Sequence, residues 1–250
     1  MKNIIINADD CGVSQYVDAE IEKCIKLGKI TSTTILANGD DFDGAINLYK
    51  LYNKEISFGW HLNLDEGQAL TRSQLLLDIG FFVEDNGIVI LNGRSFGKYN
   101  FNSEERNEIK KELKAQWGKL MDNGIKITHV DSHHFYHTRP CMLRIAPSLF
   151  RELNINRCRN ILNYGLTGIN LAARALWSSY YKLNGFKLPG TFSFYGNYHK
   201  DSSKKTKQTI ELMIHPGHSN KDYIDEYNLM LNADYKQLWP EAKLITYKDI

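Results

Sequence analysis

Ile4-Ile5-Ile6-Asn7-Ala8-Asp9-Asp10 is the stretch that decides the fold of this 250-residue chain. Three apolar residues run directly into a polar, acidic end, which is the pattern of a buried parallel strand. Ser14 follows as a helix N-cap, residues 17–25 repeat apolar side chains on one helix face, and Gly28 provides a stop. The N-terminal segment therefore predicts a strand that feeds a helix.

The same alternation continues along the chain. Further strands are predicted over residues 31–36, 56–64, 128–133, 211–215 and 242–247, and further helices over 43–52, 103–123, 142–153 and 166–181. Repeated strand–helix units imply a mainly parallel sheet with outer helices, and at this length a single-domain, irregular (β/α) barrel. Residues 65–102 break the rhythm with many glycines and a hairpin-like patch, so they are predicted to be an insertion. Residues 202–206 are predicted to form a polar, basic surface loop.

The composition is that of an ordinary globular protein, with 42% hydrophobic and 24% charged residues. The net charge of +2 gives no electrostatic case for nucleic acid or an anionic membrane as a partner. The N-terminus lacks the apolar stretch of a signal peptide, and no run reaches the roughly 18 apolar residues of a membrane span, so a cytoplasmic location is expected. The four cysteines form no Cys-x-x-Cys pair and are expected to be free thiols.

Polar clusters lie where the predicted strands end. Asp9 and Asp10 end the first strand, His61 lies in the third, residues 129–137 end the fourth, and His215 ends a late strand. The chemistry of (β/α) barrels lies at the C-terminal ends of the strands. We therefore expect these side chains to meet at the mouth of the barrel.

The cluster at 129–137 reads His-Val-Asp-Ser-His-His-Phe-Tyr-His. Because strand side chains alternate, His129, Asp131 and His133 share one face, and His137 returns to it if the chain turns after His133. Two histidines and a carboxylate on one face fit a metal site or the groups that support one. A solvated polar loop is the weaker alternative.

The other clusters each have a functional and a structural interpretation. The adjacent carboxylates of Asp9 and Asp10 repel each other and lose solvation, a cost that a divalent cation would offset; one would bind the ion while the other stays free as a base. The alternative is an acidic pair ahead of a capped helix. A lone His61 in an apolar strand is more often a core residue than a ligand, but its strand-end position favours ligation. For His215, a general acid and a water-facing histidine are equally open.

These pieces, in this order, resemble the YdjC-like family of carbohydrate deacetylases, over residues 3–217. The matching stretches are Asn7-Ala-Asp-Asp-Cys-Gly12, residues 31–34 with Asn38-Gly39, Gly59-Trp-His-Leu-Asn-Leu64, Thr128-His-Val-Asp-Ser-His-His134 and Ile214-His-Pro-Gly217. The resemblance implies an irregular (β/α) barrel. It also implies metal-dependent removal of acetyl groups from N-acetylglucosamine-containing oligosaccharides such as diacetylchitobiose, with release of acetate.

The same resemblance assigns roles to five residues. Asp10, His61 and His133 are expected to bind the metal, Asp9 to activate water as a base, and His215 to act as the acid or to stabilise the transition state. The cofactor is expected to be one divalent ion, Mg²⁺ or Zn²⁺. Two histidines and one carboxylate suit zinc better than magnesium, which prefers oxygen ligands.

Four further residues are expected to contact the substrate or to support the ligands: His129, Asp131, His137 and Arg157. The expected partner is an N-acetylated oligosaccharide or amino sugar, and a homodimer follows from the resemblance only.

Two other functions stay open at this point. One is a different metal-dependent hydrolase that acts on a phosphoester or a cyclic amide, which should show more basic residues near the ligands than Arg139, Arg157 and Arg159. The other is a non-catalytic sugar-binding protein, which would have no use for a free acid at Asp9.

Overall fold

The computed structural model describes residues 2–200 and 209–250. The polar loop predicted at residues 202–206 lies outside the described residues. Among those described, no helix combines the length and the apolar character needed to cross a bilayer.

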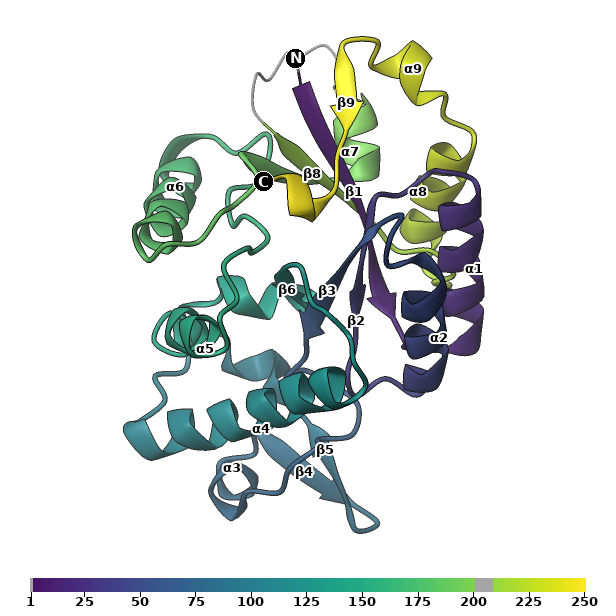
Figure 1. The fold of residues 1–250 in the computed structure, drawn as a ribbon. Helices are drawn as coiled ribbons and strands as arrows, with labels where there is room; N and C mark the ends of the chain where they lie inside the picture. The colour runs from purple at the N-terminus through teal and green to yellow at the C-terminus, as the bar shows by residue number, and fades with distance from the viewer. Residues whose placement is uncertain (1, 201–208) are drawn as a thin grey trace.

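A parallel sheet organises the molecule (Figure 1). Its strands run in the spatial order β6-β3-β2-β1-β8-β7, and β9 pairs with the beginning of β1. The bounds are β1 Lys2–Cys11, β2 Ser32–Ile35, β3 Ser57–Leu62, β6 Val130–Ser132, β7 Thr191–Phe194, β8 Ile210–Ile214 and β9 Ala242–Leu244. Every predicted strand is present, with ends shifted by at most three residues.

The sheet curls, and residues 156–164 bridge its two edges. On one side of this segment, Val130 of β6 pairs with Cys158; on the other, Asn163 pairs with Phe192 of β7. The backbone N–H of Val130 donates to the carbonyl of Arg157 at 3.0 Å, and the N–H of Phe192 donates to the carbonyl of Leu162 at 3.0 Å. The irregular (β/α) barrel expected from the sequence is confirmed.

Helices cover the outside of the sheet (Figure 1). They are α1 Gln15–Lys26, α2 Phe42–Tyr52, α4 Ser103–Asp122, α5 Ala146–Glu152, α6 Gly168–Leu183, α7 Tyr195–Lys200, α8 Lys221–Leu231 and α9 Tyr235–Leu238. Ser14 caps α1 as predicted. The predicted sequence of elements misses the strand β7 and the helices α7, α8 and α9.

Residues 65–102 form a separate layer below the barrel in Figure 1. They contain the short helix α3 Gln74–Asp78 and an antiparallel hairpin of β4 Phe82–Asp85 and β5 Ile88–Leu91. Phe81 packs against Phe96 and Phe101 within this layer and against Tyr136 outside it, so an aromatic contact joins the layer to the main core. That the segment is an insertion stays a prediction.

The two faces of the sheet differ in chemistry because side chains alternate along a strand. On β1, Ile4, Ile6 and Ala8 join the apolar core under the helices, whereas Asn7 and Asp9 face the barrel interior. The interior is therefore unusually polar and carries the residues of the site.

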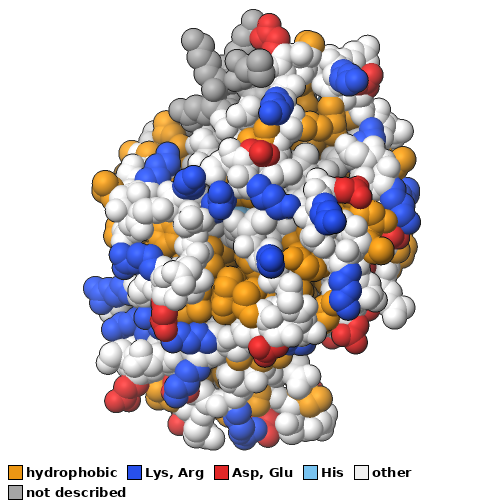
Figure 2. Space-filling model, in the orientation of Figure 1, with side chains coloured by type: hydrophobic (Ala, Val, Ile, Leu, Met, Phe, Trp, Pro, Cys, Tyr) orange, Lys and Arg blue, Asp and Glu red, His pale blue; other side chains and the backbone are white. Residues whose placement is uncertain are grey.

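On the face seen in Figure 2, basic side chains are spread widely, with acidic ones among them and apolar surface between. No single sign of charge covers this face, in keeping with the small net charge.

Candidate metal and catalytic site

The end of β1 brings two adjacent carboxylates into one cavity. In a regular strand Asp9 and Asp10 would point to opposite faces. Here the register between β1 and β2 shifts between Ala8 and Cys11, and Asp10 has a left-handed backbone with φ 69°. This conformation costs a non-glycine residue on the order of 1–3 kcal/mol and is typical of functional sites. Both side chains line a cavity of about 130 Å³.

His61 at the end of β3 and His133 just after β6 meet at Asp10. His61 Nε2 lies 3.1 Å from Asp10 Oδ1, and His133 Nδ1 lies 2.8 Å from the same oxygen. One ligand atom from each of the three residues lies within 4.8 Å of the others. The sequence prediction that these three side chains converge is correct in geometry.

Each imidazole has a carboxylate behind it. His61 Nδ1 lies 2.7 Å from Asp131 Oδ1, and His133 Nε2 lies 2.8 Å from Glu66 Oε1. The Thr34 hydroxyl donates to Asp131 Oδ2 at 3.1 Å, which fixes that carboxylate in turn. A carboxylate on the far nitrogen is the arrangement that orients metal-binding histidines in proteins.

The electrostatic field at this cluster favours positive charge. Burial opposes protonation of His61, but the carboxylates of Asp131 and Asp10 outweigh it and raise the pKa of His61 to about 10. Burial likewise opposes protonation of His133, yet Asp10 and Glu66 raise its pKa to about 9. A divalent cation would enter the same favourable field.

The donor set fits a metal ion. Two imidazole nitrogens and one carboxylate oxygen converge, with room left for water or substrate, as in catalytic sites of zinc and related transition ions. A second group of Glu66, His133 and His134 also has ligand atoms within 4.8 Å, but Glu66 is exposed there. A third group, Asp9, His61 and Asp131, is buried, but Arg159 already pairs with both of its carboxylates. The buried group around Asp10 is therefore the better candidate.

Asp9 is held by a buried arginine. Arg159 donates from Nη2 to Asp9 Oδ1 at 2.7 Å and from Nη1 to Asp9 Oδ2 at 2.8 Å. Burial opposes ionisation of Asp9, but the Arg159 guanidinium holds the pKa of this carboxyl below its ordinary value. Asp9 is therefore an ionised carboxylate with a fixed orientation, next to the candidate ligand Asp10.

The same guanidinium contacts two more carboxylates inside the barrel. Arg159 Nη2 lies 2.8 Å from Asp131 Oδ2, and Nε donates to Glu211 Oε1 at 2.8 Å. The Tyr247 hydroxyl donates to the other oxygen of Glu211. The Arg159 guanidinium therefore pairs with three buried carboxylates, those of Asp9, Asp131 and Glu211. Burial raises the pKa of Glu211 to about 7. Arg159 links β1, β6 and β8 through a single side chain.

His215 lies at the end of β8, in the same cavity as Asp9 and Asp10. Its ring stacks on Tyr223 with centroids 4.0 Å apart, and its buried Nδ1 has no hydrogen-bond partner within residues 2–200 and 209–250. Burial lowers the pKa of His215 to about 4, so the ring is neutral at neutral pH. The free nitrogen is available to a bound ligand.

Of the four supporting residues predicted from the sequence, only Asp131 contacts the cluster directly. His129 shares the predicted face but lies lower in the barrel, where its ring stacks on Tyr247 with centroids 3.6 Å apart. A Cβ at Gly59 would lie 2.5 Å from His129 Cε1, so glycine leaves the room for this ring. His137 does turn back, but its Nδ1 lies 2.5 Å from Ser132 Oγ and not at the Asp10 cluster.

The expectation that Arg157 supports the site is wrong in geometry. Its Nε donates to the carbonyl of the C-terminal Ile250 at 2.9 Å. Arg157 and Arg159 are two residues apart on the bridging segment, so they share a face at different heights in the barrel. Arg159, one step nearer the mouth, is the one that reaches Asp9.

The sequence interpretation missed Glu66, Arg159, His218 and Tyr223 as site residues. His218 Nε2 lies 3.0 Å from Asp10 Oδ2, and the His-Pro-Gly-His order at 215–218 was a usable signal for it. Glu66 follows β3 by four residues in a loop, where no local pattern marks it.

Comparisons with known proteins agree with this geometry. The family described as YdjC-like protein matches residues 3–241. The carbohydrate deacetylase of Clostridium beijerinckii is 28% identical over 99% of both chains, and that of Brevibacillus brevis is 32% identical over 61% of this chain and 57% of its own.

A crystal structure from Enterococcus faecalis V583, provisionally described as a cellobiose-phosphate cleavage protein, superposes with a TM-score of 0.78. It shares 21% identity and covers 99% of this chain and 98% of its own, so the likeness concerns the fold alone. The family match spans nearly the whole chain, and this protein therefore belongs to the YdjC-like family.

Proposed function

We propose that this protein is a metal-dependent hydrolase that removes the acetyl group from N-acetylated amino sugars. The observation that carries the proposal is one cavity with three parts: the Asp10–His61–His133 cluster, the separate carboxylate of Asp9, and the histidine His215. The name of the curated relatives, carbohydrate deacetylase, supports the reaction class. N-acetylglucosamine-containing oligosaccharides such as diacetylchitobiose are the proposed substrates.

Asp10, His61 and His133 would hold one divalent ion, with Asp131 and Glu66 orienting the two rings. Such an ion, when bound, acidifies a water molecule and polarises the acetyl carbonyl. The nitrogen-rich donor set favours Zn²⁺ or another transition ion over Mg²⁺.

Asp9 would accept the proton of the attacking water. It is ionised, and Arg159 contacts both of its oxygens, so it stays in place while the substrate changes. Its position next to Asp10 keeps it beside the candidate ligands without making it one of them. A fixed general base of this kind typically contributes 10²–10⁴-fold to a rate.

His215 would protonate the departing amine. Because the ring is neutral before reaction, it must first take up the proton that Asp9 removed from the attacking water, which leaves Asp9 ionised for the next turnover. The negative charges of Asp9 and Asp10 both favour its protonated form. The products are acetate and the free amino sugar.

The test is acetate release over a panel of N-acetylated mono- and disaccharides, with a phosphate monoester and a cyclic amide included. The wild type, Asp10→Asn, His61→Ala and Asp9→Asn are compared after removal of metal and addition of Zn²⁺, Co²⁺ or Mg²⁺. His199→Ala, a histidine on α7 that does not line the cavity, is the matched control.

We expect metal-dependent acetate release in the wild type and the control, and a loss of at least 10²-fold in the three site variants. Full activity of Asp10→Asn or His61→Ala would contradict the metal assignment. Turnover of only the phosphate monoester or only the cyclic amide would replace the proposed reaction with one of the alternatives.

A further inference from the structure

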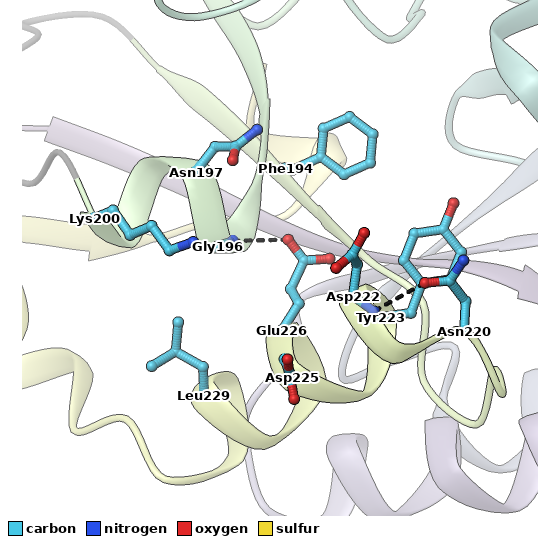
Figure 3. A pocket seen from close by; sticks show the side chains of 10 residues that line it. All are labelled: Phe194, Gly196, Asn197, Lys200, Asn220, Asp222, Tyr223, Asp225, Glu226 and Leu229. Atoms are coloured by element: carbon cyan, nitrogen blue, oxygen red, sulfur yellow. Dashed lines mark hydrogen bonds between the residues drawn. The ribbon is translucent and has the colours of Figure 1, made fainter.

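A groove between α7 and α8 opens beside the catalytic cavity (Figure 3). Its volume is about 560 Å³, against about 130 Å³ for the cavity itself. The wall on the α7 side is formed by Phe194, Asn197 and Lys200, and the α8 side includes Asn220, Asp222 and Glu226.

The groove and the cavity are adjacent. Tyr223 lines both of them, and one face of its ring stacks on His215. Phe194, at the end of β7, lies 6.5 Å from the His215 ring and 5.9 Å from the Phe135 ring, measured between centroids. A molecule whose reacting group lies at His215 would therefore extend past Tyr223 and Phe194 into the groove.

The two volumes indicate that the cavity and the groove would hold different parts of one ligand. The cavity has the volume of about four water molecules, which suits an acetamido group and part of one ring but not two sugar rings. The groove lies within the range of about 300–1,000 Å³ that is typical of small-molecule sites. It has ample room for a further pyranose ring.

The carboxylate of Glu226 offers the groove a hydrogen-bond acceptor. Its side chain is 8% exposed, and Oε1 accepts from the backbone N–H of Gly196 at 2.7 Å. Oε2 is buried, and no described residue donates a hydrogen bond to it. An unpaired buried carboxylate oxygen is costly and uncommon, and burial raises the pKa of Glu226 to about 7. A hydroxyl or amino group of a ligand would supply the missing donor.

The exposed groups around Glu226 suit the same ligand. Asn197, Asn220 and Asp222 offer amide and carboxylate groups along the groove, while Phe194 and Tyr223 offer ring faces at its entrance (Figure 3). Sugars carry closely spaced hydroxyls and apolar ring faces, and sites for them combine a few oriented polar groups with aromatic surface.

We propose that the groove between α7 and α8 is a subsite for the second sugar ring of an oligosaccharide whose acetylated ring occupies the catalytic cavity. Glu226 accepts a hydrogen bond from that second ring. The inference rests on the proposed function, and it adds the place where the second ring binds and the residue that contacts it.

Two variants test the subsite. Glu226→Gln keeps an oxygen for Gly196 but removes the charge, and Asn197→Trp fills the groove from an exposed wall position. Asn228→Ala, on an exposed position of α8 that does not line the groove, is the control. KM and kcat for acetate release are measured with an N-acetylated disaccharide and with the corresponding monosaccharide.

We expect KM for the disaccharide to rise about tenfold or more in both groove variants, with kcat nearly unchanged, while both constants for the monosaccharide stay as in the wild type. Ligand-observed NMR with the deacetylated disaccharide should show the same loss of binding without any turnover. Equal KM values for the two substrates in the wild type would overturn the subsite. So would groove variants that leave disaccharide KM and binding unchanged.

Failure of the proposed function looks different. If the wild type releases no acetate from any N-acetylated sugar and binds no amino disaccharide, the function and the subsite fall together. If the monosaccharide is deacetylated normally and the groove variants change nothing, the function stands and only the subsite is wrong.

Discussion

The upper and lower parts of the barrel interior both contain buried polar and charged side chains. They differ in whether those side chains have hydrogen-bond partners. At the mouth, Asp10, His61, His133 and His215 face a cavity, and His215 Nδ1 has no hydrogen-bond partner in the part of the chain that the structure describes. Below them, Arg159 uses all its nitrogens on carboxylates and a sulfur, and its partner Glu211 has both oxygens bonded.

This difference separates a site from a scaffold. A buried polar network whose groups are all paired rigidifies a core, whereas groups left without partners indicate a missing ligand. Asp9 and Asp131 belong to both parts, because Arg159 holds them from below while they face Asp10 or His61 above. The lower network therefore fixes the geometry of the upper cluster.

Removing the Arg159 guanidinium should destabilise the lower part of the barrel interior more than any of the changes below. Arg159→Met would leave the carboxylates of Asp9, Asp131 and Glu211 buried without their counter-ion, and we expect the free energy of unfolding to fall by about 3–5 kcal/mol. Urea unfolding measures it. Arg157→Met, which loses bonds to backbone oxygens and to the Asn156 side chain but no buried carboxylate, is the control and should lose about 1 kcal/mol. Equal losses in the two variants would contradict the distinction between the two arginines.

Asp131→Asn tests the junction between the two parts. It keeps the shape of the residue but removes the charge behind His61, so we expect Zn²⁺ to bind about 10–100-fold more weakly. Competition titration with a chromophoric chelator measures this. Glu66→Gln, which acts on His133 from a more exposed position, should have a smaller effect. A larger effect at Glu66 would show that the buried carboxylate is not the main support.

Acid should weaken the lower part through His129. Burial, and then the charge of Arg159, hold the pKa of His129 well below its ordinary value of 6.5. Below pH about 6.5, His129 takes up a proton in the unfolded chain but not in the folded protein. The contribution of His129 to the free energy of unfolding is therefore complete above this pH and falls by about 1.4 kcal/mol per pH unit below it.

The measurement compares urea unfolding of the wild type and His129→Gln between pH 8 and pH 5. The stability difference between the two proteins should be constant from pH 8 to about 7.5 and should shrink in favour of the variant as the pH falls toward 5. A difference that stays constant over the whole range would show that His129 is protonated equally in both states.

Tyr247→Phe should have the smallest effect. It removes the hydroxyl that donates to Glu211 but keeps the ring stacked on His129, so we expect a loss of about 1 kcal/mol in the free energy of unfolding. Tyr247→Leu, which also loses the stacking, should lose more. If both variants are equally stable, the stack contributes nothing and the hydroxyl alone anchors the C-terminal segment.

Local patterns in the sequence are enough to predict most of the upper part. Apolar runs, caps and strand-end polar residues place Asp9, Asp10, His61, His133 and His215 at one end of a parallel sheet, because the carboxyl ends of parallel strands meet at one edge. The bulge that turns both aspartates into the cavity is a property of strand pairing and has no local signal.

The contacts of the lower part depend on how far along the barrel axis each side chain lies. Local sequence patterns do not reveal this position. Arg157 and Arg159 look equivalent along the chain, but only the second reaches Asp9, because the bridging segment at residues 156–164 sets its own register between β6 and β7. No strand was predicted there, so its contacts with Asp131 and Glu211 could not be foreseen.

Anomalous diffraction from a crystal soaked with Zn²⁺, with data collected on both sides of the zinc absorption edge, tests the central claim most directly. The account predicts one strong peak at about 2.0–2.2 Å from a carboxylate oxygen of Asp10 and from one ring nitrogen each of His61 and His133. A zinc ion held by Glu66, His133 and His134 with Asp10 left out, or no peak at saturating zinc, would contradict it.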